Sequence, residues 1–179
     1  MKKNESIQSL KVFIFLTAFF SSGFIWAQGC SSATQRSAPD SRYQDNGDGT
    51  VSDLQIKLMW QRCSLGQSGK KCAEGTAKEF SWQKSLEQAE ALNKAGGFAG
   101  HTDWRVPTRG ELDQLAEKLC WSPAINTSLF PNTPSSSFWS ASAYTGYAGN
   151  AWYMNFSNGK ATYNHKKVLK LVRLVRNRK

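Results

Sequence analysis

The chain has 179 residues, of which 40% are hydrophobic and 20% charged, and its formal net charge is +10. Once an N-terminal export segment is set aside, residues 42–179 suffice for one domain with its own core, which excludes a multidomain protein. The excess of basic residues bears on association and solubility and does not indicate a fold.

Residues 1–29 are predicted to be a signal peptide. Lys2, Lys3 and Lys11 provide a basic start, and residues 12–27 carry no charge. This uncharged run is shorter than the roughly 20 residues that a membrane-spanning helix needs, and its length is typical of a secretory segment.

Two processing routes remain open at the end of this segment. Signal peptidase could cut after Ala27, which would give a secreted protein. Alternatively, the small residue Gly29 precedes Cys30 in an imperfect lipobox, and a lipid on Cys30 would anchor the chain to a membrane of the cell envelope. We expect the second route, with the Ser- and Ala-rich residues 30–41 as a flexible tether.

The other cysteines follow from this expectation. Cys63 and Cys72 bracket a short loop whose closure costs little entropy, so they are predicted to form a disulfide in an oxidising compartment. Cys120 would then be left over. If Cys30 carries no lipid, it could pair with Cys120, and a buried free thiol at Cys120 is the remaining alternative.

Near its start, the domain sequence contains residues that favour a tight turn. Asn-Gly and Asp-Gly pairs over residues 46–49 favour a tight hairpin. No glutamate closes this acidic loop as an EF-hand requires, so a turn is preferred to a calcium site. Apolar spacing then predicts two helices, and strand-like runs predict the remaining elements: strands 50–53 and 58–61, helices 81–95 and 109–119, and strands 138–142, 151–156 and 170–175. This order predicts an α+β fold of antiparallel strands with two helices and a long irregular loop.

A structural motif joins an extended segment to the second helix. Thr108 and Glu111 fit a capping box, in which each side chain satisfies a backbone N–H at the helix start. Pro107 keeps the preceding residue extended and prevents an earlier start of the helix. We interpret the whole motif as a joint in the scaffold, comprising Asp103, Trp104, Arg105, Pro107, Thr108 and Glu111.

An ordered set of short motifs runs through the domain: residues 48–51, 58–61, 102–108, 111–112, 130–133, 138–142 and 172–176. Together they resemble the Lcl C-terminal domain family, over residues 42–177. The resemblance implies a C-type-lectin-like fold, an exported or surface protein, and binding of sulfated or otherwise anionic glycans.

The chain also departs from what the resemblance brings. It has no Gly-X-Y repeats, so collagen-driven trimerisation is not implied. The calcium-binding sugar motifs of true C-type lectins, Glu-Pro-Asn and Trp-Asn-Asp, are absent. Calcium-dependent sugar binding therefore does not follow from the fold.

Catalytic chemistry finds little support. The only histidines are His101 and His165, and no nucleophile motif, zinc-ligand cluster or phosphate loop occurs. We expect a binding protein without cofactor or metal, and not an enzyme. Trp104, Trp139 and Trp152 could stack on sugars, but such strand and helix-entry positions are more often core.

The C-terminal residues suggest where a ligand binds. Clustered cations bind sulfated or phosphorylated polymers through counterion release. Arg173 and Arg176 are expected to make structural ion pairs, which leaves as candidate ligands Lys166, Lys167, Lys170, Arg178 and Lys179. The predicted partner is an anionic glycan or, alternatively, another envelope protein recognised by a structural or assembly module; no specific nucleic acid is expected.

Overall fold

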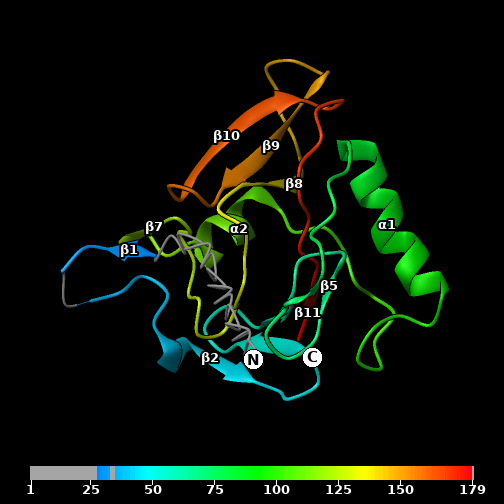
Figure 1. Ribbon diagram of the computed structural model, residues 1–179. Helices are drawn as coiled ribbons and strands as arrows, with labels where there is room; N and C mark the ends of the chain where they lie inside the picture. The colour runs from blue at the N-terminus through cyan, green and yellow to red at the C-terminus, as the bar shows by residue number, and fades with distance from the viewer. Residues whose placement is uncertain (1–27, 33–34, 179) are drawn as a thin grey trace, which may run out of the picture.

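The computed structural model describes residues 28–32 and 35–178 (Figure 1). Most of the predicted signal peptide and Lys179 lie outside the described residues. Within those ranges, no helix is both long and apolar enough to span a membrane.

A four-stranded antiparallel sheet forms the lower part of the molecule in Figure 1, with strand order β11-β4-β3-β2. Its members are β2 (Tyr43–Asp45), β3 (Thr50–Asp53), β4 (Leu58–Gln61) and β11 (Val175–Asn177). β3 and β4 coincide with the predicted strands. The turn between β2 and β3 places Gly47 and Gly49 at φ values of 79° and 88°, a region that glycine enters without steric cost.

A three-stranded antiparallel sheet, β10-β9-β8, forms the upper part. It contains β8 (Ser137–Ala143), β9 (Asn150–Asn155) and β10 (Lys160–His165). β8 and β9 confirm two predicted strands, whereas β10 was not predicted. The predicted strand 170–175 is mostly wrong: it is reduced to isolated bridges at Lys170 and Leu171, and β11 begins only at Val175.

Two further strand pairs and one 3-10 turn lie outside these two sheets. β1 (Gly29–Cys30) pairs with β7 (Cys120–Trp121), and β5 (Gln67–Ser68) pairs with β6 (Glu74–Gly75). A single 3-10 turn, η1 (Asp40–Arg42), leads into β2.

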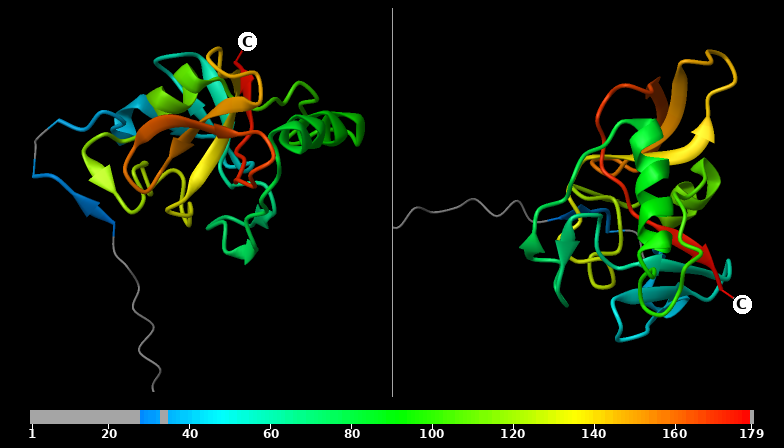
Figure 2. Two further views of the ribbon diagram at one scale, coloured as in Figure 1. Left: turned by 90° about the horizontal axis from the view of Figure 1, so that it is seen from above. Right: turned by 90° about the vertical axis from the view of Figure 1, so that its right-hand side faces the viewer.

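The two helices are α1 (Trp82–Lys94) and α2 (Arg109–Leu115). α1 fills its predicted range and lies along one side of the molecule (Figure 2). α2 is shorter than the predicted 109–119, because Ala116 is already extended and forms a bridge with Ile125. The antiparallel sheets and two helices confirm the α+β class.

The core has two parts. The larger cluster joins residues of both sheets to α2, and its fully buried members include Trp60, Leu115, Phe138 and Met154. The second lies under α1, where Ala89 packs with residues of the junction motif and of the segment before β11. The larger cluster places α2 against β8 and β9, which fixes the position of its first residue beside the upper sheet.

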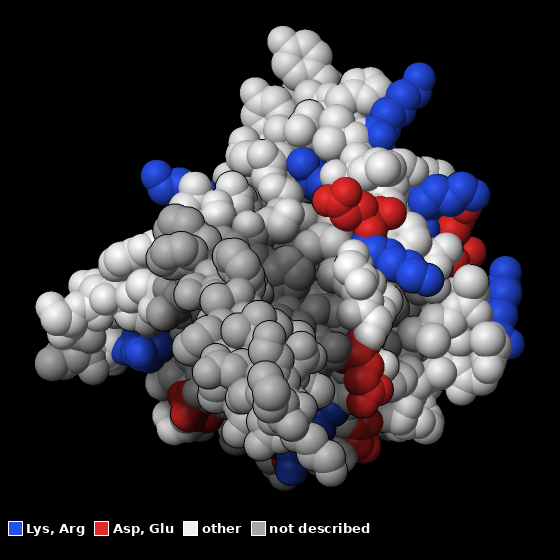
Figure 3. All heavy atoms as spheres, in the orientation of Figure 1, with Lys and Arg blue, Asp and Glu red and all other residues white. Residues whose placement is uncertain are grey.

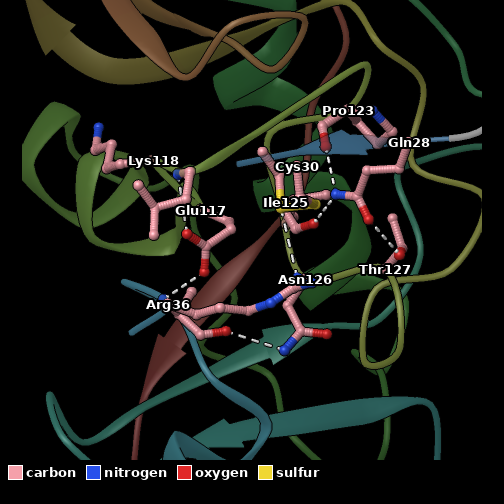
Figure 4. The surroundings of a disulfide bond; sticks show 12 residues. Gln28, Cys30, Arg36, Glu117, Lys118, Pro123, Ile125, Asn126 and Thr127 are labelled. Atoms are coloured by element: carbon pink, nitrogen blue, oxygen red, sulfur yellow. Dashed lines mark hydrogen bonds between the residues drawn. A yellow bond between two sulfur atoms is a disulfide. The ribbon is translucent and has the colours of Figure 1, made fainter. Parts of the chain in front are cut away.

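The described residues before β2, namely 28–32 and 35–41, are packed on the domain, whereas a flexible tether was predicted over residues 30–41. We call them the N-terminal arm, and Figure 4 shows part of it around Gln28, Cys30 and Arg36. The Gln28 side chain donates to the carbonyls of Pro123 (2.6 Å) and Ile125 (2.7 Å) and accepts from Thr127 (2.9 Å). Ala38 is fully buried in the main core cluster. These contacts make the described part of the arm a component of the fold.

The sulfur of Cys30 forms a disulfide with Cys120 across the β1–β7 pair. The expected lipidation of Cys30 is not shown: the structure places this sulfur in a disulfide, and one sulfur cannot hold both a thioether to lipid and a disulfide. The predicted disulfide between Cys63 and Cys72 is confirmed. No cysteine among the described residues is free.

The fully buried carboxylate of Glu117 holds the arm from the domain side (Figure 4). It accepts hydrogen bonds from the backbone N–H groups of Ser37 (3.1 Å), Ala38 (2.8 Å) and Leu119 (3.0 Å) and from the Ser37 hydroxyl (2.9 Å). Burial alone would raise the pKa of Glu117, but these N–H donors outweigh it and hold the pKa below its usual range.

Candidate functional site

The junction motif is a joint between elements. Thr108 and Glu111 form the predicted capping box. Glu111 also receives two hydrogen bonds from the Arg105 guanidinium, at 2.7 and 2.8 Å, and the backbone of Arg105 exchanges hydrogen bonds with Val175. The carbonyl of Pro107 accepts from Ala141 of β8 at 2.7 Å. The motif thus ties the start of α2 to both sheets.

The acidic and aromatic members of the motif are also engaged. Asp103 forms an ion pair with Arg176 (2.6 Å), and this hydrogen bond holds the pKa of Asp103 below its usual range. Trp104 is 2% exposed and exchanges backbone hydrogen bonds with the Asn93 side chain. Since their contacts are internal, these residues support the scaffold and leave no ring free for a sugar.

Arg176 thus has its expected ion pair, but Arg173 does not. The Arg173 guanidinium is fully buried and donates to the carbonyls of Gln61 and Arg62 and to the Thr133 hydroxyl (2.7 Å). Burial lowers the pKa of Arg173 to about 9, so the group stays protonated at neutral pH. Its carbonyl partners, rather than a carboxylate, hold the segment before β11 against β4.

The candidate polyanion ligands are separated in space. Lys166 and Lys167 follow β10 at the top of Figure 1, whereas the exposed Arg178 follows β11 at the bottom, where its N–H donates to Lys57. Lys170 is only 6% exposed. The four of these residues that the structure describes therefore do not form one surface, and Lys179 lies outside the described residues.

Lys170 has a packing role. Its ammonium group lies 3.8 Å from the ring centroid of Tyr153 and 5.2 Å from that of Trp139. Burial lowers the pKa of Lys170. Trp139 is fully buried, and its indole N–H donates to Phe80 (2.9 Å). Trp139, like Trp104, is therefore a core residue, as expected.

A partly exposed group of aromatic rings gathers at the upper sheet, and we call it the aromatic tip: Tyr144, Tyr147, Trp152 and Tyr163. Tyr163 of β10 stands directly opposite Trp152 of β9, and the loop between β8 and β9 supplies the other two. Tyr144 stacks on Tyr163 with centroids 3.8 Å apart and planes at 10°, and it meets the Trp152 edge at 5.3 Å. Tyr147 is 68% exposed and Tyr163 41%.

The tip is held together before any ligand arrives. Backbone hydrogen bonds from Tyr144 to Asn150 and from Asn150 to Tyr147 close the loop. The neighbouring Tyr144 hydroxyl raises the pKa of Tyr163. Because the rings already contact one another, binding to their exposed faces would require little ordering of side chains.

Two cations lie beside the tip. The Arg109 guanidinium, at the first position of α2, lies 4.0 Å from the Trp152 ring centroid. The Lys166 ammonium donates to Ala148 in the tip loop (2.7 Å) and lies 4.5 Å from the ring centroid of Trp82. In Figure 3 the top of the molecule is largely uncharged, with basic side chains at its margin. The arrangement offers ring faces and positive charge side by side.

Only part of this site is predictable from the sequence. Trp152 and the lysines were among the residues considered for binding, whereas Arg109, Tyr144 and Tyr147 were not. The available signal was a pair of tyrosines in a glycine-containing loop between two predicted strands. Nothing in the local sequence around Arg109 indicated its contact with Trp152, because that contact depends on how α2 packs on the sheet.

Within the described ranges, no three His, Cys, Asp or Glu side chains are arranged to hold a metal ion. The Lcl C-terminal domain family model matches residues 49–176, which is most of the chain. The chain therefore belongs to the Lcl C-terminal domain family, and this membership associates it with surface and adhesin domains. Comparison with curated proteins gives no match.

Proposed function

We propose that this protein is an exported surface module that binds an anionic glycan through the aromatic tip. The observation that carries the proposal is the exposed stack of rings with Arg109 and Lys166 beside it. Aromatic faces pack against the apolar faces of sugar rings, and guanidinium and ammonium groups pair with sulfate or carboxylate oxygens. Lys167, exposed next to Lys166, adds a further charge.

We further propose that the scaffold is C-type-lectin-like. Three features support this assignment: β2 and β11, near the two ends of the domain, share one sheet, two helices flank the sheets, and a long irregular segment separates β7 from β8. No calcium site is part of the proposal.

Binding is tested with a size-defined heparin fragment by isothermal titration calorimetry at two salt concentrations. The double variant Lys166→Ala/Lys167→Ala should bind more weakly and with a shallower salt dependence, because fewer counterions are released. The matched control is Lys70→Ala/Lys71→Ala, a second adjacent pair of exposed lysines away from the tip, which should bind like the parent protein.

The contribution of the rings is tested with Tyr147→Ala, whose side chain has one ring partner and is mostly exposed. The variant should bind about tenfold more weakly, because truncating an interface aromatic commonly costs more than 1 kcal/mol. Equal binding by the parent and by both the lysine and the tyrosine variants would refute the tip as the glycan site.

A second function is recognition of another envelope protein by the same tip. The specific observation in its favour is the residue content, since Tyr, Trp and Arg are enriched at protein interfaces. In that case Tyr147→Ala would abolish capture of a partner from envelope extracts, and heparin would not compete.

For localisation, we propose export with cleavage after Ala27 and no lipid on Cys30. The disulfide to Cys120 supports this route, because it uses the sulfur that lipidation requires and forms in oxidising compartments. The mass of the mature protein tests it: a chain starting at Gln28 with two disulfides is expected, and an acylated Cys30 would refute it.

A further inference from the structure

A pocket of about 590 Å³ lies at the opposite end of the molecule from the aromatic tip. Three segments form its walls: the turn between β2 and β3, the loop that the Cys63–Cys72 disulfide closes, and the C-terminal part of α1 with Phe98 just beyond it. Its volume is within the range of small-molecule sites, and the disulfide restrains one wall.

One side of the pocket is apolar. Leu65, Leu92 and Phe98 line it, and Phe98 remains 36% exposed. The Phe98 ring is held in place by Trp104: the two rings form a T-shaped pair with centroids 5.9 Å apart. The backbone carbonyl of Phe98 also accepts a hydrogen bond from the Trp104 indole N–H (3.0 Å). A side chain at Gly49 would come within 2.9 Å of the ring, so the glycine keeps this side open.

The other side is polar. Arg62 is 7% exposed and forms an ion pair with Asp45 across the pocket wall. Gln67 also lines this side.

The charges of the pocket balance. Asp45 and Asp48 face Arg62 and the exposed Lys70. An anion would gain little from such a site, whereas hydroxyl groups can donate to the carboxylates and accept from the basic side chains. A ring with one apolar face and a hydroxyl-bearing edge satisfies both sides of the pocket.

We propose that this pocket binds one neutral pyranose unit, with its apolar face on Phe98 and its hydroxyls toward Asp45 and Arg62. The site is separate from the aromatic tip and takes a ligand of different charge. It would allow one domain to hold an uncharged sugar and an anionic chain at two ends.

The probes are the methyl glycosides of glucose, galactose, mannose and N-acetylglucosamine, each titrated into the exported protein by saturation-transfer NMR. At least one should receive saturation. Phe98→Ala should weaken its binding at least tenfold, and Phe98→Tyr, which keeps the ring, should restore it. Tyr147→Ala at the tip is the control and should leave glycoside binding unchanged.

In the unsubstituted protein, the methyl resonances of Leu65 and Leu92 report on binding directly, because a sugar in the pocket would change their chemical shifts. No saturation of any of the four glycosides, or binding that leaves these resonances and Phe98→Ala unaffected, would overturn the proposal. Heparin binding is measured on the same variants, so a failure of the pocket is distinguished from a failure of the tip.

Discussion

The two disulfides should contribute unequally to stability. Cys30–Cys120 closes a sequence separation of 90, whereas Cys63–Cys72 closes one of 9. In the chain-entropy description, a cross-link stabilises by restricting the unfolded chain, and the effect grows with the logarithm of the closed length. For these separations it predicts losses of about 4.6 and about 2.6 kcal/mol when each pair is removed.

The perturbations are the double variants Cys30→Ala/Cys120→Ala and Cys63→Ala/Cys72→Ala. Since a domain of this size is typically stable by only about 5–15 kcal/mol, loss of the longer cross-link should remove a large share of the total. The free energy of unfolding in water is measured by urea titration of the oxidised proteins. The exported parent protein is the reference.

An equal loss in the two variants, or a larger loss for Cys63/Cys72, would refute the reasoning. The first outcome would mean that the N-terminal arm stays docked through its hydrogen bonds alone and that the unfolded chain gains little freedom. Intact mass before unfolding verifies that the remaining disulfide is formed in each variant.

Three further predictions concern single side chains. Glu117→Gln should lower the free energy of unfolding by about 2–3 kcal/mol. In the parent protein a carboxylate oxygen accepts from the backbone N–H of Ala38, whereas in the variant the amide NH2 group would face that N–H, and two donors form no hydrogen bond. The pKa of Glu117 is lowered in the folded protein, so this carboxylate stabilises the fold above the ordinary carboxyl pKa, and the stabilisation is lost as pH falls through the folded pKa. Urea titrations at decreasing pH should therefore show a loss of stability in the parent protein and a smaller loss in the variant. Glu111→Ala should lower the free energy of unfolding by about 1–2 kcal/mol, because it removes the capping box and the contact with Arg105. The loss should appear as a lower Tm, and an unchanged Tm would contradict the structural role of the junction motif. Lys170→Met should change stability by less than about 1.5 kcal/mol and leave heparin affinity unchanged, because the ammonium group is buried over Tyr153; a clear loss of affinity would return Lys170 to the ligand surface.

Local chemistry made much of the fold predictable. The Asn-Gly and Asp-Gly turn, the apolar stripe of α1 and the Thr108–Glu111 capping box each depend on residues close in sequence, and the structure contains all three. β10 was missed because it is an edge strand with mostly exposed, mixed side chains, which give no clear apolar alternation.

Long-range contacts account for what could not be predicted. Residues 35–41 have the composition of a tether, and their order depends on Glu117, about 80 positions away. The lysines and arginines near the C-terminus are close in sequence, yet the chain runs from the upper sheet to the lower between Lys166 and Arg178. Proximity along the chain therefore overstated their proximity in space.

The placement of the terminal strands sets the reach of the molecule. β2 and β11 occupy the two outer positions of the lower sheet, so the arm enters and the C-terminal segment leaves at the end away from the aromatic tip (Figure 1). Anything joined after β11 would lie at the end of the domain opposite the aromatic tip, so the tip would point away from it. The tip would then be the first part of the domain to meet an approaching surface.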